Sequence, residues 1–342
     1  MFEGTYLDAI RTALQDAMAD DPRVFCLGED IGAYGGAFKA TEGLMEAYGD
    51  LRVLDTPIAE QAIAGAAIGA ALMGQRPVAE FQFMDFALLA SDLMVNFAAK
   101  THWRWGQPCP VVFRGPCGAG VGGGPFHSQN PEAHFLPAPG LKVVAPGTVA
   151  DAYALLRAAI QDDDPVLFLE HKALYRRLKD RWETAPTARL GEAALRKDGT
   201  RAVILTYGAM QHRALEAVAG SQAHLPKEGL QGEAQEGPND AVGDMDVAVL
   251  DLRTLNPLDW ETIEGLVKRT HRVLVLTEAS RTYGPSAEIA AEVAERCFPW
   301  LDAPVQRLAA QDTPCPASPP LEAAFLPSVE AIREASKKLM AW

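Results

Sequence analysis

The chain has 342 residues, 48% of them hydrophobic and 22% charged, a composition typical of a soluble globular protein of about two domains. Its net charge of −14 at pH 7 argues against nucleic acid or an anionic membrane as a partner, because both require clustered Lys and Arg. The first residues lack a basic region followed by an apolar run, and no segment is apolar over the roughly 20 residues that span a bilayer. We therefore expect a cytoplasmic protein.

The first half of the chain predicts an α/β domain with a largely parallel sheet covered by helices. Short runs rich in Val, Ile and Leu alternate with alanine-rich stretches there. The expected strands are 24–27, 78–81, 111–113, 141–144 and 166–169. We expect a buried helix over 61–73, because its Ala and Gly residues allow close approach of another backbone.

The second half repeats the alternation and predicts a second α/β domain. We place the first domain at 1–185, a linker at 186–200 and the second domain at 201–342. The expected strands are 202–206, 247–250 and 272–276, and the expected helices are 208–219, 260–270, 286–296 and 328–339. Residues 221–243 are rich in Gly, Gln, Glu, Asn and Pro, which predicts a flexible insertion.

Cysteine spacing predicts neither a disulfide framework nor a zinc site. The number of cysteines is odd and no two of them have metal-ligand spacing, so we expect reduced thiols. The cysteines are Cys26, Cys109, Cys117, Cys297 and Cys315.

The segment 55–61 (DTPIAEQ) predicts the start of the alanine-rich helix. Thr56 suits the N-cap, Pro57 the first helical position, and Glu60 then falls in the first turn. Its carboxylate either complements the helix dipole or accepts a hydrogen bond from a ring nitrogen of a cofactor. The residues by themselves favour the first interpretation.

A glycine-rich segment, 118–123 (GAGVGG), fits the dinucleotide-binding pattern only formally. The pattern requires a helix after the last glycine, but a loop with Pro125 and Pro131 follows, and no Gly-Lys-Ser/Thr is present. We interpret the segment as a flexible turn that lets the loop around His127 approach a ligand or partner closely.

Two further features leave alternatives open. His127 lies on a loop, where catalytic groups concentrate, but loop histidines are often merely solvated. The acidic run 162–164 is typical of a solvated loop, although main-chain carbonyls and one carboxylate there could hold a hard cation.

Seven motifs in order give the chain a resemblance to one family. They are 27–32 (LGEDIG), 55–60 (DTPIAE), 76–86 (RPVAEFQFMDF), 127–133 (HSQNPEA), 164–172 (DPVLFLEHK), 251–259 (DLRTLNPLD) and 325–330 (FLPSVE). The chain resembles, over nearly its whole length, the β subunit of the thiamine-diphosphate-dependent decarboxylating component of 2-oxo acid dehydrogenase complexes. This resemblance implies a transketolase-like pyrimidine-binding domain followed by a transketolase C-terminal domain.

The resemblance also implies roles for individual residues. Glu60 matches the carboxylate that hydrogen-bonds the aminopyrimidine of thiamine diphosphate and favours its imino tautomer. Phe86 matches an aromatic position near the pyrimidine, and Gln82 lies on the same segment. His127 matches the active-site histidine that guides substrate or the incoming lipoyl group.

Metals and partners follow from the same resemblance. The potassium site of relatives matches Cys109, Val111, Val112, Ala159, Asp162 and Asp164, although Asp164 stands where relatives often have asparagine. The Gly-Asp-Gly segment that holds the magnesium diphosphate in such enzymes is absent. We therefore expect an α subunit to hold the magnesium, with the cofactor shared in an α2β2 heterotetramer.

The expected function is decarboxylation of a 2-oxo acid and transfer of the acyl group to lipoyl groups of a dihydrolipoyl acyltransferase core. The segments 60–61 and 130–133 favour a branched-chain substrate. Pyruvate and acetoin dehydrogenase β subunits are the alternatives, as is a non-catalytic assembly subunit of the same fold. A flavodoxin-like redox module is disfavoured because the glycine-rich segment opens no helix.

Overall fold

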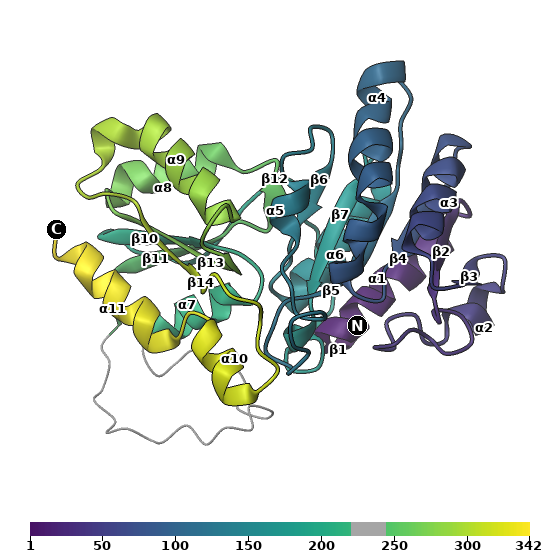
Figure 1. Cartoon of the computed structure of the whole chain (residues 1–342), viewed down its shortest axis with the longest axis horizontal. Helices are drawn as coiled ribbons and strands as arrows, with labels where there is room; N and C mark the ends of the chain where they lie inside the picture. Colours follow the sequence, from purple (N-terminus) through teal and green to yellow (C-terminus); the bar gives the residue numbers. More distant parts are fainter. Residues whose placement is uncertain (220–243) are drawn as a thin grey trace. The chain divides into compact units, whose positions relative to one another are not determined.

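The computed structural model describes residues 1–219 and 244–342, so the insertion predicted at 221–243 lies outside the described residues. Its internal contacts divide the chain into two compact units (Figure 1). The first unit comprises Met1–Cys117, His134–Gly191 and Thr254–Pro257, and the second comprises Gly118–Ala133, Glu192–Arg253 and Leu258–Trp342. The chain passes from one unit to the other several times, and the passage at Gly191 and Glu192 falls within the linker that we predicted at 186–200.

The first unit is built on a seven-stranded sheet of order β12-β6-β7-β5-β4-β2-β3. Its strands are β2 (Val24–Glu29), β3 (Val53–Thr56), β4 (Arg76–Glu80), β5 (Val112–Cys117), β6 (Lys142–Val144), β7 (Val166–His171) and β12 (Thr254–Asn256). All neighbours are parallel except β12, which is antiparallel to β6. A separate antiparallel pair joins β1 (Phe2–Thr5) and β8 (Lys179–Trp182).

The five strands predicted for this unit are confirmed, and the buried runs explain why. Every residue of β5 and β7 is buried, as expected for strands covered on both faces. No range was predicted for β1, β8, β12 or β3; the last lies at the edge of the sheet and has only one fully buried residue, Val53.

Helical segments pack on this sheet in two groups. They are α1 (Tyr6–Asp20), α2 (Leu44–Tyr48), α3 (Glu60–Leu72), η1 (Met84–Ala90), η2 (Leu93–Ala98), α4 (Ala99–Trp105), α6 (Val149–Gln161) and η3 (Lys172–Leu174). The short helix α5 (Glu132–Phe135) lies where the chain passes from the second unit to the first. Helix α1 packs on α6, and α3 packs on the 3-10 segment η1 and the π-helical segment η2. Side-chain caps precede two of these helices: the Thr5 side chain accepts the Asp8 N–H, and the Thr148 side chain accepts the Asp151 N–H.

Helix α3 corrects two predictions. It begins at Glu60 after Ala59, without a side-chain cap, so the prediction of Thr56 as N-cap and Pro57 as first helical residue was wrong. Thr56 instead ends β3, where the ladder to β2 fixes its backbone. The helix is also buried on one face only, since Ala62, Ala66 and Gly69 are exposed.

The second unit contains a five-stranded sheet of order β14-β13-β10-β11-β9, parallel except for β9. Its strands are β9 (Ala194–Lys197), β10 (Ala202–Thr206), β11 (Val247–Asp251), β13 (Val273–Ser280) and β14 (Gln306–Ala310). Its helical segments are α7 (Met210–Val218), α8 (Trp260–Thr270), α9 (Pro285–Cys297), η5 (Phe298–Trp300), α10 (Pro319–Phe325) and α11 (Val329–Met340). The three strands and four helices predicted for this unit are confirmed, whereas β9, β14 and α10 were missed.

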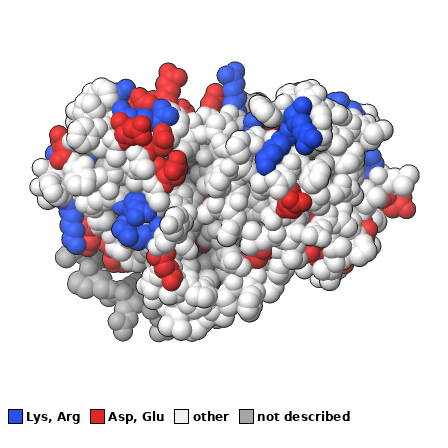
Figure 2. All heavy atoms as spheres, turned by 45° about the horizontal axis from the view of Figure 1, so that its top comes forward, with Lys and Arg blue, Asp and Glu red and all other residues white. Residues whose placement is uncertain are grey.

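The cysteines, the length of the helices and the distribution of surface charge bear on three further expectations. All five cysteines lie among the described residues, are buried and form no disulfide. None of the described helices combines the length and apolar character needed to cross a bilayer. Acidic and basic side chains are interspersed on the face drawn in Figure 2, without a continuous basic patch among its described atoms.

Candidate functional site

Buried polar groups gather at the carboxyl edge of the parallel sheet in the first unit, where α/β proteins bind ligands. Glu29 ends β2 and pairs in register with Thr56, which ends β3. Glu60 follows as the first residue of α3, so its carboxylate lies at the positive end of that helix. The side chains of Glu29 and Glu60 are 4% and 6% exposed.

This edge combines a carboxyl group of raised pKa with buried polar atoms that lack partners. Burial raises the pKa of Glu29, and the neighbouring carboxylates of Glu60, Asp30 and Glu80 raise it further. Glu29 Oε1 and Thr56 Oγ1 are buried without a hydrogen-bond partner among the described residues. Buried polar atoms normally have partners, so a ligand with N–H donors fits this edge chemically.

Next to this edge, Arg114 on β5 forms a buried ion-pair network. Its Nε and Nη2 donate to the two carboxylate oxygens of Glu170 at 2.5 and 2.7 Å, and its Nη1 pairs with Glu80. The Tyr175 hydroxyl donates to Glu170 Oε2 at 2.6 Å. Because these groups come from β4, β5 and the β7 region, the network fixes the carboxyl ends of adjacent strands.

The other predicted pyrimidine contacts lie on the segment after β4. Gln82 and Phe86 are half-buried, and Phe86 belongs to η1, which packs against α3. Phe86 meets the ring of Phe83 edge-on, and Phe38 extends this aromatic row. Glu60, Gln82 and Phe86 therefore belong to one structural unit.

His127 belongs to the second unit and lies on the loop 118–133, as the sequence predicted. Its side chain is half-buried, and its main-chain N–H donates to the carbonyl of Gly124 at 3.3 Å. Further along this loop, the Tyr207 hydroxyl donates to Glu132 Oε1 at 2.5 Å. Burial raises the pKa of Glu132 to about 7, against the lowering effect of the Tyr207 hydrogen bond.

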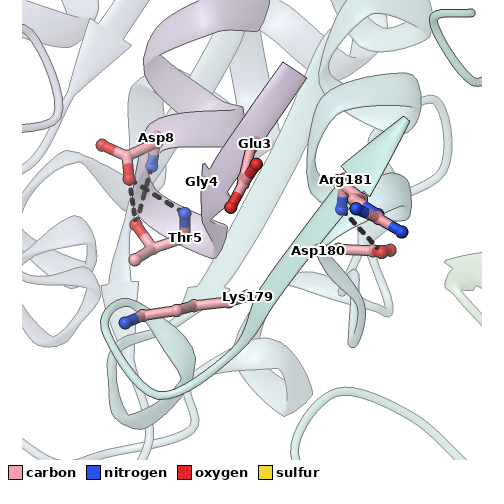
Figure 3. Close-up of a pocket in the computed structure, with 7 residues that line it drawn as sticks. All are labelled: Glu3, Gly4, Thr5, Asp8, Lys179, Asp180 and Arg181. Atoms are coloured by element: carbon pink, nitrogen blue, oxygen red, sulfur yellow. Dashed lines mark hydrogen bonds between the residues drawn. The ribbon is translucent and has the colours of Figure 1, made fainter. Parts of the chain in front are cut away.

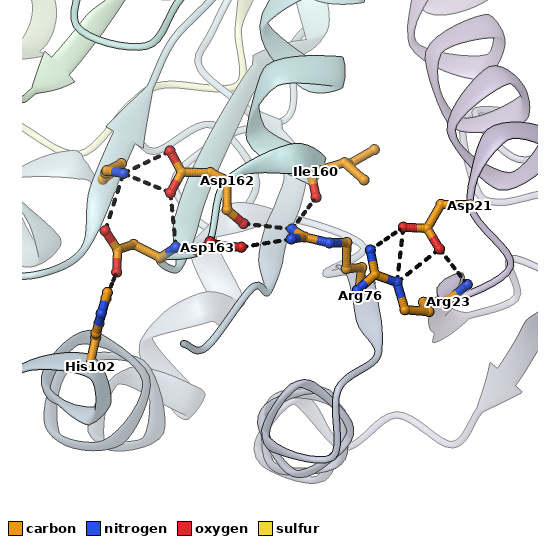
Figure 4. Close-up of polar contacts among 9 residues, drawn as sticks. Asp21, Arg23, Arg76, His102, Ile160, Asp162 and Asp163 are labelled. Carbon is orange, nitrogen blue, oxygen red and sulfur yellow. Dashed lines mark hydrogen bonds and ion pairs between the residues drawn. The ribbon is translucent and has the colours of Figure 1, made fainter. Parts of the chain in front are cut away.

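The predicted potassium residues surround the loop after α6, and protein cations already contact that loop (Figure 4). Arg76 Nη1 donates to the carbonyl oxygens of Ile160 and Asp162 at 3.0 and 2.9 Å. Its Nη2 pairs with Asp163 Oδ1 at 2.6 Å. The arginine thus places positive charge at one of the predicted potassium ligands.

The two predicted carboxylate positions are also engaged. Lys142 Nζ lies 2.7 Å from both carboxylate oxygens of Asp162 and 3.3 Å from Asp164 Oδ2. His102 Nδ1 lies 2.6 Å from Asp164 Oδ1. Burial raises the pKa of Asp164, but the contacts of His102 and Lys142 outweigh burial and lower it.

The main-chain positions of this set bond within the backbone. The carbonyl oxygens of Cys109, Val111 and Ala159 accept N–H groups of Val111, Val166 and Asp162, and Val112 pairs within the sheet. No group of three or more metal-ligating side chains occurs among the described residues. The predicted potassium ligands are thus contacted by main-chain N–H groups and by protein side chains in this structure.

A recess of about 540 Å³ lies away from these residues, between β1 and β8 (Figure 3). Its lining is Glu3, Gly4, Thr5, Asp8, Lys179, Asp180 and Arg181. Thr5 and Asp8 bond each other in the capping box of α1, so their polar atoms serve the helix start. The recess contains none of the predicted site residues.

Comparison with known families agrees with both units. Residues 3–177 match the family described as "Transketolase, pyrimidine binding domain", and residues 239–332 match "Transketolase, C-terminal domain". A solved structure, "Split gene transketolase, inactive beta4 tetramer", superposes with a TM-score of 0.74 over 99% of each chain at 20% identity. The chain is therefore a transketolase-like protein with a pyrimidine-binding and a C-terminal domain.

Curated relatives narrow the class. The chain is 42% identical to the 2-oxoisovalerate dehydrogenase subunit beta of Bacillus subtilis (strain 168), over 98% of each chain. It is 41% identical to the pyruvate dehydrogenase E1 component subunit beta of Rickettsia felis, over 98% of each chain. It is 40% identical to a mitochondrial pyruvate dehydrogenase E1 β subunit of Arabidopsis thaliana, over 98% of this chain and 89% of that one. The chain belongs to the family of E1 β subunits of 2-oxo acid dehydrogenases.

Sequence reasoning missed several polar residues at these sites. Glu29 lies inside a motif that we recognised, but nothing local indicates that it neighbours Glu60. Arg114 stands in an apolar strand, where a buried charge signals a buried partner. Glu278 in β13 is likewise a charged residue in an apolar strand, and the sequence analysis did not consider it.

Proposed function

We propose that this chain is the β subunit of a 2-oxo acid dehydrogenase that decarboxylates a branched-chain 2-oxo acid on thiamine diphosphate and acylates lipoyl groups. The buried carboxylate pair Glu29 and Glu60, beside unsatisfied polar atoms at the sheet edge, is the observation that carries the proposal. Thiamine diphosphate, when bound, supplies the carbanion and the electron sink for decarboxylation.

Glu60 would hold the aminopyrimidine of the cofactor through a ring nitrogen. Its carboxylate is withdrawn from water and faces the charge of Glu29, which strengthens a hydrogen bond to any N–H donor placed there. Phe86 and Gln82 would pack beside the ring from the segment that follows β4. Phe86 and Gln82 would thus orient the cofactor, and Glu60 would control the protonation of its ring nitrogen.

His127 would serve the second half of the reaction by guiding the substrate or the lipoyl group. Its imidazole is half-buried on a loop, and loops often carry the groups that act on a substrate. Histidine is the side chain that most often transfers protons in enzymes, which suits a role during acyl transfer.

An α subunit would complete the enzyme. The chain has no Gly-Asp-Gly segment for the magnesium diphosphate, so we assign magnesium to the partner in an α2β2 heterotetramer. Large apolar side chains exposed on the first unit support an interface: Ile58, Met73, Leu89, Phe97, Trp103 and Trp105. A dihydrolipoyl acyltransferase core would receive the acyl group, and we place the assembly in the cytoplasm.

The test is Glu60→Gln in the chain assembled with its α subunit and supplied with magnesium and thiamine diphosphate. We expect turnover of 3-methyl-2-oxobutanoate to fall at least about 100-fold, because a neutral amide cannot replace the carboxylate in proton management. Dye-coupled decarboxylation measures turnover, and sedimentation measures assembly. Glu330→Gln is the matched control, because Glu330 is exposed in the second unit.

The same assay discriminates the alternatives. Preference for pyruvate over 3-methyl-2-oxobutanoate would assign the chain to the pyruvate class. Full turnover of an assembled Glu60→Gln enzyme would contradict the role of Glu60. Absence of turnover in an assembled wild-type tetramer would favour a non-catalytic assembly subunit.

A further inference from the structure

The glycine-rich segment 118–124 has a backbone that binds anions. Gly118, Gly120, Gly122 and Gly124 have φ values of 82°, 91°, 73° and 70°, whereas the residues between them do not have positive φ. Alternation of left-handed and ordinary conformations turns successive N–H groups toward one side, which forms an anion-binding concavity. Glycine is required because L side chains strain this conformation.

The anion in this concavity comes from the chain itself. Glu322 on α10 accepts the Gly120 N–H at 2.8 Å through Oε1 and the Gly122 N–H at 3.1 Å through Oε2. Its side chain is buried, so the two bonds are formed away from water. The concavity is therefore filled by a carboxylate and not by a phosphate of a ligand.

A second buried carboxylate ties the same loop at both ends. Glu278 Oε1 on β13 accepts the Ala119 N–H at 2.6 Å and the side-chain amide of Asn130 at 3.2 Å. The Gly118 N–H donates to the Gln129 carbonyl at 3.0 Å, which closes the loop around His127. All these groups belong to the second unit.

Apolar packing holds the loop and Glu322 together. Ala119 is part of a buried cluster with Ala310, Cys315, Phe325 and Leu326, the last two beside Glu322 in sequence. A side chain at Gly124 would come within 3.2 Å of Ala317. The loop therefore has little freedom to move while Glu322 remains bound.

We propose that Glu322 is a positioning residue that fixes the backbone of loop 118–130 and thereby holds His127 in its working position. This inference rests on the role proposed above for His127. Charge matters because a carboxylate accepts two N–H groups at once, whereas the amide of glutamine must turn one donor toward them.

The experiment compares Glu322→Gln, His127→Gln and the double variant in the assembled α2β2 complex. We expect Glu322→Gln to lower kcat/KM for acylation of a free lipoyl domain by about 10- to 100-fold, the value of one or two charge-assisted hydrogen bonds. The double variant should be within about twofold of His127→Gln, because residues that act as a unit are not additive. If the loss in the double variant equalled the product of the two single losses, Glu322 would act independently of His127. Its role would then be merely structural, and the proposal would be overturned.

A second readout does not depend on catalysis. Amide hydrogen exchange of peptides covering 118–130 should accelerate in Glu322→Gln and stay unchanged in the control Glu330→Gln. Unchanged exchange in Glu322→Gln would overturn the proposal even if activity fell. Glu322→Asp, which keeps the charge on a shorter side chain, should recover part of the protection.

The outcomes separate this inference from the proposed function. If His127→Gln acylates lipoyl groups normally, the role of His127 fails and the inference fails with it. If His127→Gln is impaired and Glu322→Gln is not, only the inference fails. If Glu60→Gln remains fully active, the proposed cofactor site fails, while the exchange result still tests the loop.

Discussion

At the scale of single residues, Glu132 is the clearest titrating group in the second unit. Its pKa is raised from 4.5 to about 7, mainly by burial. A carboxyl whose pKa is higher in the folded state favours folding at low pH, and this contribution is lost as pH rises from about 4.5 through about 7. Glu132 should therefore weaken the folded state at alkaline pH.

We predict that Glu132→Gln reduces this pH dependence. Between pH 5 and pH 8, the free energy of unfolding should fall by about 2–3 kcal/mol less in the variant than in the wild type. The Tyr207 hydroxyl can still donate to the amide oxygen of glutamine. Urea unfolding at both pH values measures the difference.

The matched control for this prediction is Glu330→Gln, in which an exposed carboxylate is removed. It should leave the pH dependence of the wild type unchanged. An identical pH dependence in Glu132→Gln and the wild type would mean that Glu132 is ionised in the folded protein at all pH values tested.

Single residues also differ in how far the sequence predicts them. Glu60 was placed in the first turn of its helix, and the structure has it there, because helix starts carry local signals. The Thr56 and Pro57 assignments failed because strand pairing with β2 overrode the capping preference. Tertiary contacts outweigh a preference worth about 1 kcal/mol.

At the scale of elements, the loop between α6 and β7 combines three acidic residues with two basic side chains and a histidine. Arg76, Lys142 and His102 contact the loop at the positions predicted to hold potassium. A potassium ion there would face the guanidinium and the ammonium groups at close range. We therefore predict that folding of this chain does not depend on potassium.

The measurement is the free energy of unfolding in 100 mM KCl and in 100 mM NaCl. A site with a Kd of about 1 mM would add about 2.7 kcal/mol in the potassium buffer. We expect no difference for the wild type. In Arg76→Met, which frees the carbonyl oxygens of Ile160 and Asp162, a potassium-specific stabilisation should appear.

Arg23→Met is the control, because Arg23 is a nearby arginine whose pair with Asp21 is largely exposed (Figure 4). It should change stability by less than about 1 kcal/mol in either salt. Stabilisation of the wild type by potassium would contradict the prediction and favour the potassium site of the sequence analysis.

At the scale of the whole molecule, exposed tryptophans indicate where a partner binds. Trp103 on α4 is 92% exposed, and Trp105 is 57% exposed on the same helix. Exposed aromatic side chains of this size are enriched in interfaces, where they often dominate the binding energy. We predict that Trp103 is buried when the α subunit binds.

Trp103→Ala should weaken assembly with the α subunit about 30-fold, the effect of a hot-spot residue worth about 2 kcal/mol. Analytical ultracentrifugation measures the affinity, and a blue shift of tryptophan emission should accompany assembly of the wild type. Trp342→Ala, at an exposed tryptophan of the second unit, is the control. Equal affinities for Trp103→Ala and the wild type would place the interface elsewhere.

From the sequence alone came the α/β class, the buried strands and the helices α3, α7, α8, α9 and α11, because these depend on side-chain periodicity over a few residues. It also determined the family, because ordered motifs survive as local patterns. The tertiary structure decided which distant groups meet: Glu29 with Glu60, Arg114 with Glu170, and Glu322 with Gly122, 200 residues apart. Such contacts depend on the three-dimensional arrangement of the sheets and loops, which no local sequence pattern specifies.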